Sequence, residues 1–116
     1  MRSRAKGANG ERELAATFTE MGYTSRRTQQ YCGTAGDSDV VVEELPALHF
    51  ECKRVERLNI DNAMAQAVRD SAASNATPVV CHRKNGGEWM LTIRLADMEL
   101  FAALIHASKG QKKVAE

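Results

Sequence analysis

Three charged residues, Asp39, Glu51 and Lys53, are spaced so that two short strands can place them on one surface. Residues 40–42 and 48–53 are strand-like and are separated by a short loop. If they pair as a hairpin about the middle of that loop, Asp39 and Glu51 are direct cross-strand neighbours, with Cβ atoms about 4.5–5.5 Å apart. Glu51 and Lys53 are two residues apart, so their side chains share a face. The spacing therefore predicts two carboxylates and an ammonium group on one face of the hairpin.

The opposite face of this predicted hairpin is apolar. Its side chains are those of Val40, Val42, Leu48, Phe50 and Cys52. A slip of one residue would turn the acids toward the core, so the alternation strongly specifies the register. We expect the apolar face to be buried and the charged face to be displayed.

Two carboxylates with a free backbone carbonyl form an incomplete oxygen site that suits Mg²⁺ or Mn²⁺ and leaves room for water and phosphate. A metal ion in such a site polarises a phosphoryl oxygen and lowers the pKa of a bound water. A lysine beside it can orient that water or offset negative charge on the phosphate. The competing interpretation is an exposed ion-pair ladder, because the spacing Asp-x(11)-Glu-x-Lys is a weak pattern on its own.

Glu11 is a further acidic candidate. It precedes Leu14, Ala15 and Phe18 by three, four and seven residues, so it shares the apolar face of the first predicted helix. An acidic side chain near the N-terminal turn of a helix is stabilised by the positive end of the helix dipole, which is one explanation for Glu11. On a core-facing stripe it also needs a partner, and an adjacent metal site would supply one.

The composition, 116 residues with 43% hydrophobic and 27% charged, is that of one folded domain. We expect a single domain over 1–116, with its core at about 6–107 and a flexible tail at 108–116. No apolar run approaches the roughly 18 residues that a membrane span requires. The three cysteines are odd in number and widely separated, which favours free thiols in a reducing compartment such as the cytoplasm. No pair of cysteines or histidines has the spacing of a zinc site.

Charge is unevenly distributed along the chain. Residues 1–31 carry a net charge of +3, residues 32–53 carry −4, and the remainder carries +2. A randomly mixed, solvated surface would account for this distribution. The alternative is a metal site set in a basic cradle for a polyanion such as nucleic acid.

Three segments have the apolar spacing of helices. The first runs from Leu14 to Met21 and stops at Gly22, and the second follows Asn59 as its N-cap. The third runs from Ala96 to about His106. We expect the inward face of the third helix to consist of Leu100, Ala103, Leu104 and Ala107.

Segments without a helical period are interpreted as strands. They are residues 23–31, 40–42, 48–53, 79–82 and 88–94, with a hairpin turn at Asn85-Gly86-Gly87 between the last two. With the helices they give the order αβββαββα. This order indicates a single α/β domain with a central mixed β-sheet flanked by helices.

Short motifs in order along the chain resemble those of the PD-(D/E)XK nuclease superfamily. They are Glu11-Arg12-Glu13-Leu14 after Gly7, Gly-Asp-Ser-Asp-Val at 36–40 and Phe-Glu-Cys-Lys at 50–53. Within that superfamily the chain is similar, from about Lys6 to Leu104, to the small Holliday-junction resolvases of archaea and their phage-encoded relatives. The resemblance implies a restriction-endonuclease-like fold and an endodeoxyribonuclease that depends on Mg²⁺, with Mn²⁺ able to substitute.

The resemblance also implies roles for individual residues. The metal ligands would be Asp39, Glu51 and the main-chain carbonyl of Cys52. Asp37 is the alternative to Asp39, and we favour Asp39 because it heads the apolar strand and pairs with Glu51, which leaves Asp37 as a turn residue. Lys53 would be the catalytic lysine.

Two more residues would assist the implied site. Glu11 would be an additional catalytic acid near the metal, and Gln66 would support Lys53 or the attacking water from the second helix.

Basic and amide side chains around these motifs are candidates for DNA contacts, because arginine forks match phosphate oxygens and amides add hydrogen bonds. The candidates are Arg26, Arg27, Gln29, Gln30, Arg54, Arg83 and Lys84. Ordinary surface polarity on the strand, and a solvated loop at the hairpin, remain the alternatives for them.

These observations predict a metal-dependent DNA endonuclease that acts on branched DNA such as four-way junctions. A nickase or repair nuclease with the same site, and a non-catalytic DNA-binding module, are the alternatives. A four-way junction has two-fold symmetry and the chain carries one catalytic set, so we expect a homodimer. Its interface would be the last helix or the strand around Trp89. We expect no membrane partner, no small-molecule cofactor beyond the metal, and a location in the cytoplasm, or in the host cytoplasm if the protein is phage-encoded.

Overall fold

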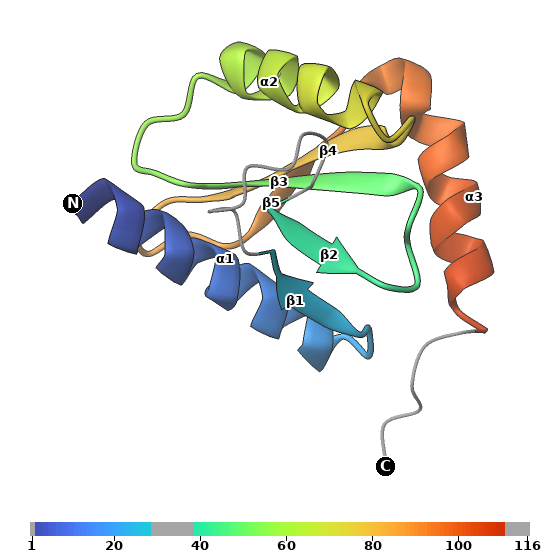
Figure 1. Ribbon diagram of the computed structural model, residues 1–116, viewed down its shortest axis with the longest axis horizontal. Helices are drawn as coiled ribbons and strands as arrows, with labels where there is room; N and C mark the ends of the chain where they lie inside the picture. The colour runs from blue at the N-terminus through green and yellow to red at the C-terminus, as the bar shows by residue number, and fades with distance from the viewer. Residues whose placement is uncertain (1, 29–38, 111–116) are drawn as a thin grey trace.

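The structure, a computed structural model, describes residues 2–28 and 39–110. Its elements follow the predicted order αβββαββα (Figure 1). They are α1 (Arg2–Glu20), β1 (Ser25–Arg27), β2 (Val40–Val42), β3 (Leu48–Arg54), α2 (Ile60–Ala72), β4 (Thr77–Arg83), β5 (Met90–Thr92), the 3₁₀ turn η2 (Leu95–Asp97) and α3 (Met98–Ser108). Within the described ranges no helix is both long and apolar enough to cross a membrane.

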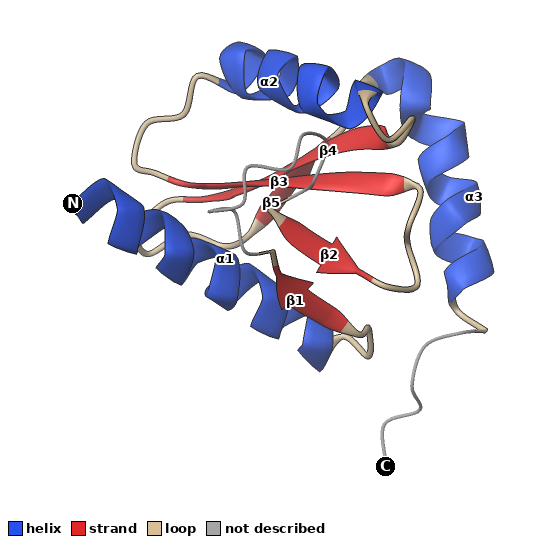
Figure 2. Cartoon of the chain, viewed as in Figure 1, coloured by secondary structure: helices blue, strands red, loops and turns tan. Residues whose placement is uncertain are grey.

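The five strands form one mixed sheet in the order β1-β2-β3-β4-β5. Strand β3 pairs antiparallel with β2 and parallel with β4, and the two outer pairs are antiparallel. The parallel pair requires a crossover, which α2 provides on one side of the sheet (Figure 2). The predicted fold class, a mixed sheet flanked by helices, is therefore confirmed.

The two faces of the sheet are covered by different helices. Helix α1 packs on one face, here called the α1 face, where Leu14 and Phe18 contact a buried cluster that includes Val40 and Phe50. Helix α2 packs on the other, the α2 face, over β3 and β4. Helix α3 adds partly buried side chains to the cluster on the α1 face (Figure 1).

Helix α2 begins at the predicted N-cap. The side chain of Asn59 accepts a hydrogen bond of 3.0 Å from the backbone amide of Asn62, which satisfies one of the free donors of the first turn. The buried residues of the helix are small, Ala63, Ala67 and Ser71. Small side chains let the helix axis approach β3 and β4 closely, so α2 lies directly over the polar residues of β3.

Helix α1 also approaches the sheet closely, at Gly10. A Cβ atom at this position would lie 2.7 Å from the Cβ of Arg54 on β3, which is closer than such atoms approach. The helix ends at Glu20, and Gly22 follows with a positive φ of 102°, as the glycine stop signal predicts. The absence of a side chain at Gly10 therefore fixes how near α1 lies to β3.

The inward face that we predicted for the last helix is wrong. Leu100, Ala103 and Ala107 are exposed, and only Leu104 of the predicted set packs on the core. The residues that face inward are Phe101, Leu104, Ile105 and Ser108, whose hydroxyl lies 3.4 Å from that of Tyr23. The buried stripe is therefore shifted by one residue from the predicted stripe.

Several predicted boundaries also differ from the structure. Helix α1 begins at Arg2, well before the predicted start at Leu14. Strand β4 begins at Thr77 and includes Pro78, whereas β5 is limited to Met90–Thr92. Strand β1 is Ser25–Arg27, and the rest of the extended segment predicted to follow it lies, with the turn at 32–38 and the tail after Gly110, largely outside the described residues.

Candidate active site

Asp39 and Glu51 are cross-strand neighbours, as the spacing predicted. Val40 pairs with Phe50 in the β2–β3 ladder, and the amide of Asp39 donates a 3.0 Å hydrogen bond to the carbonyl of Phe50. The Asp39 carboxylate is held at the end of β2, because its Oδ2 accepts a 2.9 Å hydrogen bond from the amide of Cys52. The predicted register is therefore confirmed.

The charged face is not displayed to solvent, however, and this part of the prediction is wrong. Glu51 is only 3% exposed and His49, two residues before it, only 2%, because α2 covers this part of the sheet. The sequence alternation identified which side chains share the face but not that a helix would cover it. The acidic pair therefore lies at the margin between α2 and the open part of the sheet.

The pKa of Asp39 is raised to about 7, first by burial and then by the negative charge of Glu51. Glu11 on α1 adds a smaller increment of the same sign, while the hydrogen bond from the Cys52 amide opposes it. Carboxylates that repel one another at a buried position are stabilised by a cation between them. This donor set, all oxygen and negatively charged, fits a hard divalent cation.

Lys53 lies beside the acidic pair and is held from α2. Its Nζ donates a 2.9 Å hydrogen bond to Oε1 of Gln66 and lies 4.0 Å from Oε2 of Glu51. The contact between the second helix and Lys53 that the sequence suggested is thus present. It holds the ammonium group in one position next to a carboxylate.

Glu11 has a different partner from the one that we expected. Arg27 on β1 lies 3.1 Å from the carboxylate of Glu11, so this acid on the inward face of α1 forms an ion pair with an arginine. Arg27 is opposite Val40 in the β1–β2 ladder, which places its side chain on the α1 face together with Glu11. Glu11 remains close enough to raise the pKa of Asp39.

Two more of the arginines predicted to contact DNA are also paired with α1. Glu13 accepts hydrogen bonds from Arg54 at 3.2 Å and from Arg83 at 2.5 Å. Arg54 is also bonded to Asn85 in the β4–β5 turn, at 2.8 Å. Through these hydrogen bonds the two arginines connect α1, β3 and the β4–β5 hairpin. This structural contribution was not predicted from the sequence.

Arg26 differs from its neighbour Arg27. It is opposite Val41 in the ladder, so its side chain shares the α2 face with the acidic pair, and it is exposed. In the part of the chain that the structure describes, no carboxylate lies within ion-pair distance of Arg26. Lys84, in the turn after β4, is likewise exposed, whereas Gln29, Gln30 and Asp37 lie outside the described residues.

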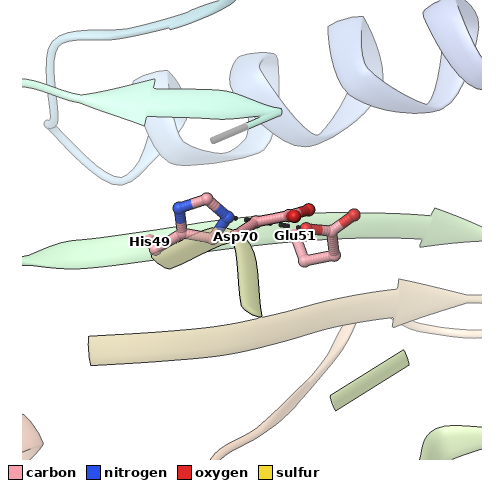
Figure 3. Close-up of side chains that lie close together, drawn as sticks. All are labelled: His49, Glu51 and Asp70. Atoms are coloured by element: carbon pink, nitrogen blue, oxygen red, sulfur yellow. Dashed lines mark ion pairs between the residues drawn. The ribbon is translucent and has the colours of Figure 1, made fainter. Parts of the chain in front are cut away.

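A cluster between β3 and α2 that includes Glu51 was not predicted from the sequence. His49 on β3, Glu51 and Asp70 on α2 place one ligand atom each within 4.8 Å of one another, and their side chains point together (Figure 3). The zinc-site rule rejected His49, because no other histidine lies at the required spacing from it, and the rule does not consider carboxylate ligands. The available signal was that His49 and Glu51 share a strand face, but the third member comes from a helix.

The family of the chain follows from a comparison with protein-family models. The family described as "Phage putative PDDEXK endonuclease" matches residues 2–115, which is nearly the whole chain. No curated protein sequence matches the chain.

Among solved structures, the fold is similar to that of Hjc from Archaeoglobus fulgidus, a Holliday junction resolvase from an archaeal hyperthermophile. The two share 18% sequence identity, with a TM-score of 0.55 over 72% of each chain. The resemblance that the motifs indicated is therefore confirmed both by the family model and by the fold. The chain belongs to the phage PDDEXK endonuclease family.

Proposed function

We propose that the protein is a divalent-metal-dependent DNA endonuclease that hydrolyses phosphodiester bonds at four-way junctions. The observation that carries this proposal is the acidic pair Asp39–Glu51 with the ammonium group of Lys53 held 4.0 Å from Glu51. Membership of an endonuclease family supports the reaction, and the fold shared with Hjc, a Holliday junction resolvase, supports the substrate.

Mg²⁺ is the proposed cation, and Mn²⁺ would substitute for it. Asp39, Glu51 and the main-chain carbonyl of Cys52 would hold it, and Glu11 would add negative charge nearby. When bound, the cation supplies Lewis-acid chemistry, since it polarises a phosphoryl oxygen and lowers the pKa of water. The crowding that raises the pKa of Asp39 supports a cation at this position.

Lys53 would stabilise the negative charge that develops on the phosphate during hydrolysis. Its ammonium group is compact and bears three donors, one of which is used by Gln66 at 2.9 Å. The remaining donors are available to a phosphate oxygen or to the attacking water. Gln66 would act as a positioning residue, because it fixes the direction of the Lys53 side chain without contacting substrate.

Arg26 is the best placed of the candidate DNA contacts. It lies on the face of the sheet that carries the acidic pair, and it is exposed. Phosphates tracking across β1 and β2 toward Lys53 would pass this side chain. Lys84 would extend the basic path at the hairpin, whereas Arg27 mainly serves the ion pair with Glu11.

A homodimer is supported by an exposed apolar strip along β5, η2 and α3. Its members are Met90, Leu91, Leu95, Met98 and Leu100. The strip joins the two interface candidates from the sequence, the last helix and the strand around Trp89, and it includes the sheet's edge strand β5. Exposed large apolar side chains on consecutive elements are candidates for burial in a protein interface, and Met90 and Leu91 lie on opposite faces of the edge strand. A two-fold dimer would present two active sites to a two-fold symmetric junction.

The proposal is tested by incubating the protein with labelled four-way, forked and linear duplex DNA, in Mg²⁺ or in EDTA. We expect paired cuts in the four-way junction with Mg²⁺ and none in EDTA. Glu51→Gln should abolish cleavage while DNA binding is retained. The matched control is Glu43→Gln, which changes an exposed acid after β2 and should leave cleavage unchanged.

Other outcomes would identify the alternatives. Equal cutting of all three substrates, or single nicks alone, would make the protein a general or repair nuclease with the same site. Junction binding without cleavage under any divalent cation would favour a non-catalytic binding module. Full activity in EDTA would contradict the mechanism.

A further inference from the structure

The buried cluster of His49, Glu51 and Asp70 contains a polar atom without a partner. The side chain of His49 is 1% exposed, and its Nε2 makes no hydrogen bond within the part of the chain that the structure describes. The nearest carboxylate oxygen, Oε1 of Glu51, lies 3.5 Å away. A buried ring nitrogen without a hydrogen bond is costly, so the position calls for a ligand that coordinates it.

We propose that His49, Glu51 and Asp70 form a second cation site, specific for a transition metal such as Mn²⁺ or Zn²⁺. One ligand atom from each residue lies within 4.8 Å of the other two. Metal–ligand bonds of about 2.0–2.2 Å place neighbouring ligand atoms about 3–3.5 Å apart, so modest side-chain adjustments close the site. The three groups converge from β3 and α2, as Figure 3 shows.

The ligand types set the choice of metal. Imidazole nitrogen suits Zn²⁺, and the two carboxylates suit Mn²⁺, which also accepts a nitrogen ligand, whereas Mg²⁺ prefers oxygen alone and keeps several waters. The proposed catalytic site around Asp39 offers only oxygen, so the two positions differ in chemistry. Three protein ligands also leave at least one coordination position open for water.

Glu51 belongs to both sites, and its two oxygens face in different directions. Oε1 faces His49 at 3.5 Å, and Oε2 faces Lys53 at 4.0 Å. A cation on the His49 side would fix the orientation of this carboxylate and stabilise its negative charge. The second site therefore positions a residue of the proposed active site, yet metal binding there does not depend on nuclease activity.

The competing description is a simple ion pair, in which a protonated His49 is held between two carboxylates. The contact of Nε2 with Glu51 does not have hydrogen-bond geometry, and that description would leave a buried N–H donor unsatisfied. Coordination uses the same nitrogen lone pair directly. The two descriptions differ in one observable, which is whether a bound metal ion has nitrogen in its first coordination sphere.

Pulsed electron paramagnetic resonance on Mn²⁺ bound to the untagged full-length protein tests this directly. We expect nitrogen modulation of the electron spin echo in the wild type and its loss in His49→Gln. His82→Gln is the matched control, because His82 is a partly exposed histidine bonded to Thr92 and should leave the modulation intact. Wild-type protein with bound Mn²⁺ but no nitrogen modulation would overturn the proposal, as would modulation that persists in His49→Gln.

A second pair of variants tests the helix ligand without disturbing the buried histidine. Asp70→Asn should weaken Zn²⁺ binding at least tenfold in a competition assay with a chromophoric chelator. Asp61→Asn, an exposed acid at the start of the same helix, should not change it. Equal affinities in both variants, or Zn²⁺ binding only at millimolar concentration, would overturn the proposal.

The outcome is separable from that of the proposed catalytic function. Asp39→Asn removes a ligand of the proposed catalytic cation only, so it should abolish cleavage and retain the nitrogen modulation. A protein that never cleaves DNA but shows the His49-dependent modulation would contradict the catalytic proposal and support the cation site at His49. A protein that cleaves DNA normally without any nitrogen modulation would support the catalytic proposal and contradict the cation site at His49.

Discussion

The carboxylate of Asp39 accepts a 2.9 Å hydrogen bond from the backbone amide of Cys52, so a side chain as well as the ladder joins β2 to β3 at the proposed active site. This contact fixes one oxygen of Asp39. The second oxygen remains for the proposed cation. Asp39 therefore has a structural contribution that can be separated from its charge.

Asp39→Asn and Asp39→Ala should both abolish cleavage but should differ in stability. Asparagine can still accept from the Cys52 amide and removes repulsion from Glu51, so we expect its melting temperature in EDTA to equal or exceed that of the wild type. Alanine leaves the amide without its acceptor, which costs about 1–3 kcal/mol. Thermal unfolding in EDTA checks this order, and an Asn variant less stable than the Ala variant would contradict it.

Gln66→Ala should lower the cleavage rate about ten- to a hundredfold, the equivalent of one hydrogen bond to a charged group. The affinity for junction DNA should change little, because Gln66 holds Lys53 and does not reach the substrate. Single-turnover kinetics with saturating enzyme separates the two quantities. Asn62→Ala, an exposed amide on the same helix, is the control and should behave as wild type. An unchanged cleavage rate in Gln66→Ala would show that Gln66 does not position Lys53.

Arg26→Ala and Arg27→Ala should affect different properties, DNA binding and thermal stability respectively, although the two residues are adjacent. Loss of Arg26 should weaken DNA binding and reduce the slope of log affinity against log salt by about one, as for one lost phosphate contact. Loss of Arg27 should mainly lower the melting temperature, since it leaves the largely buried carboxylate of Glu11 without its partner. Salt titrations and thermal unfolding of both variants test this, and the reverse assignment would show that the faces are used differently.

Leu95→Glu should convert a dimer to monomers without unfolding the chain, because Leu95 is 82% exposed and lies in the apolar strip. Met21→Glu is the matched control, since Met21 is also an exposed apolar residue but follows α1, away from the strip. Light scattering with size-exclusion chromatography gives the mass of each variant. A wild-type monomer at micromolar concentration would contradict the dimer.

The two described cysteines should react slowly with alkylating reagents. Burial raises the pKa of Cys81 to about 12, and burial also raises that of Cys52, so few thiolates exist at about pH 8. In a Cys32→Ser variant, we expect iodoacetamide to label the folded protein far more slowly than the same protein in urea. Equal rates in the two conditions would show that the sheet opens readily.

The hairpin of the active site could be predicted because a strand has a period of two residues. Assigning Val40 and Phe50 to the core placed Asp39 and Glu51 on the other face, and centring the hairpin on its loop placed them opposite each other, as the ladder confirms. The order of elements followed from equally local signals, such as the cap at Asn59 and the turn at Asn85.

What the sequence could not reveal depends on contacts between distant segments. Nothing near Glu51 indicates that α2 will cover it, or that Asp70 will approach His49. The pairing of Arg83 with Glu13 joins residues 70 positions apart. The predicted face of the last helix was wrong for a different reason, because α3 is apolar on more than one side and its spacing did not decide which side packs on the core.

Strand β3 is the middle strand of the sheet, and it carries His49, Glu51, Cys52 and Lys53 between two helical layers. The backbone of these residues pairs with β4 throughout and with β2 through the Val40–Phe50 pair, so exposing them requires the β3–β4 ladder to break. Their amides should exchange with deuterium at the rate of global unfolding, with the Cys52 amide as a convenient reporter. The proposed catalytic groups would therefore stay assembled for as long as the β3–β4 ladder is intact.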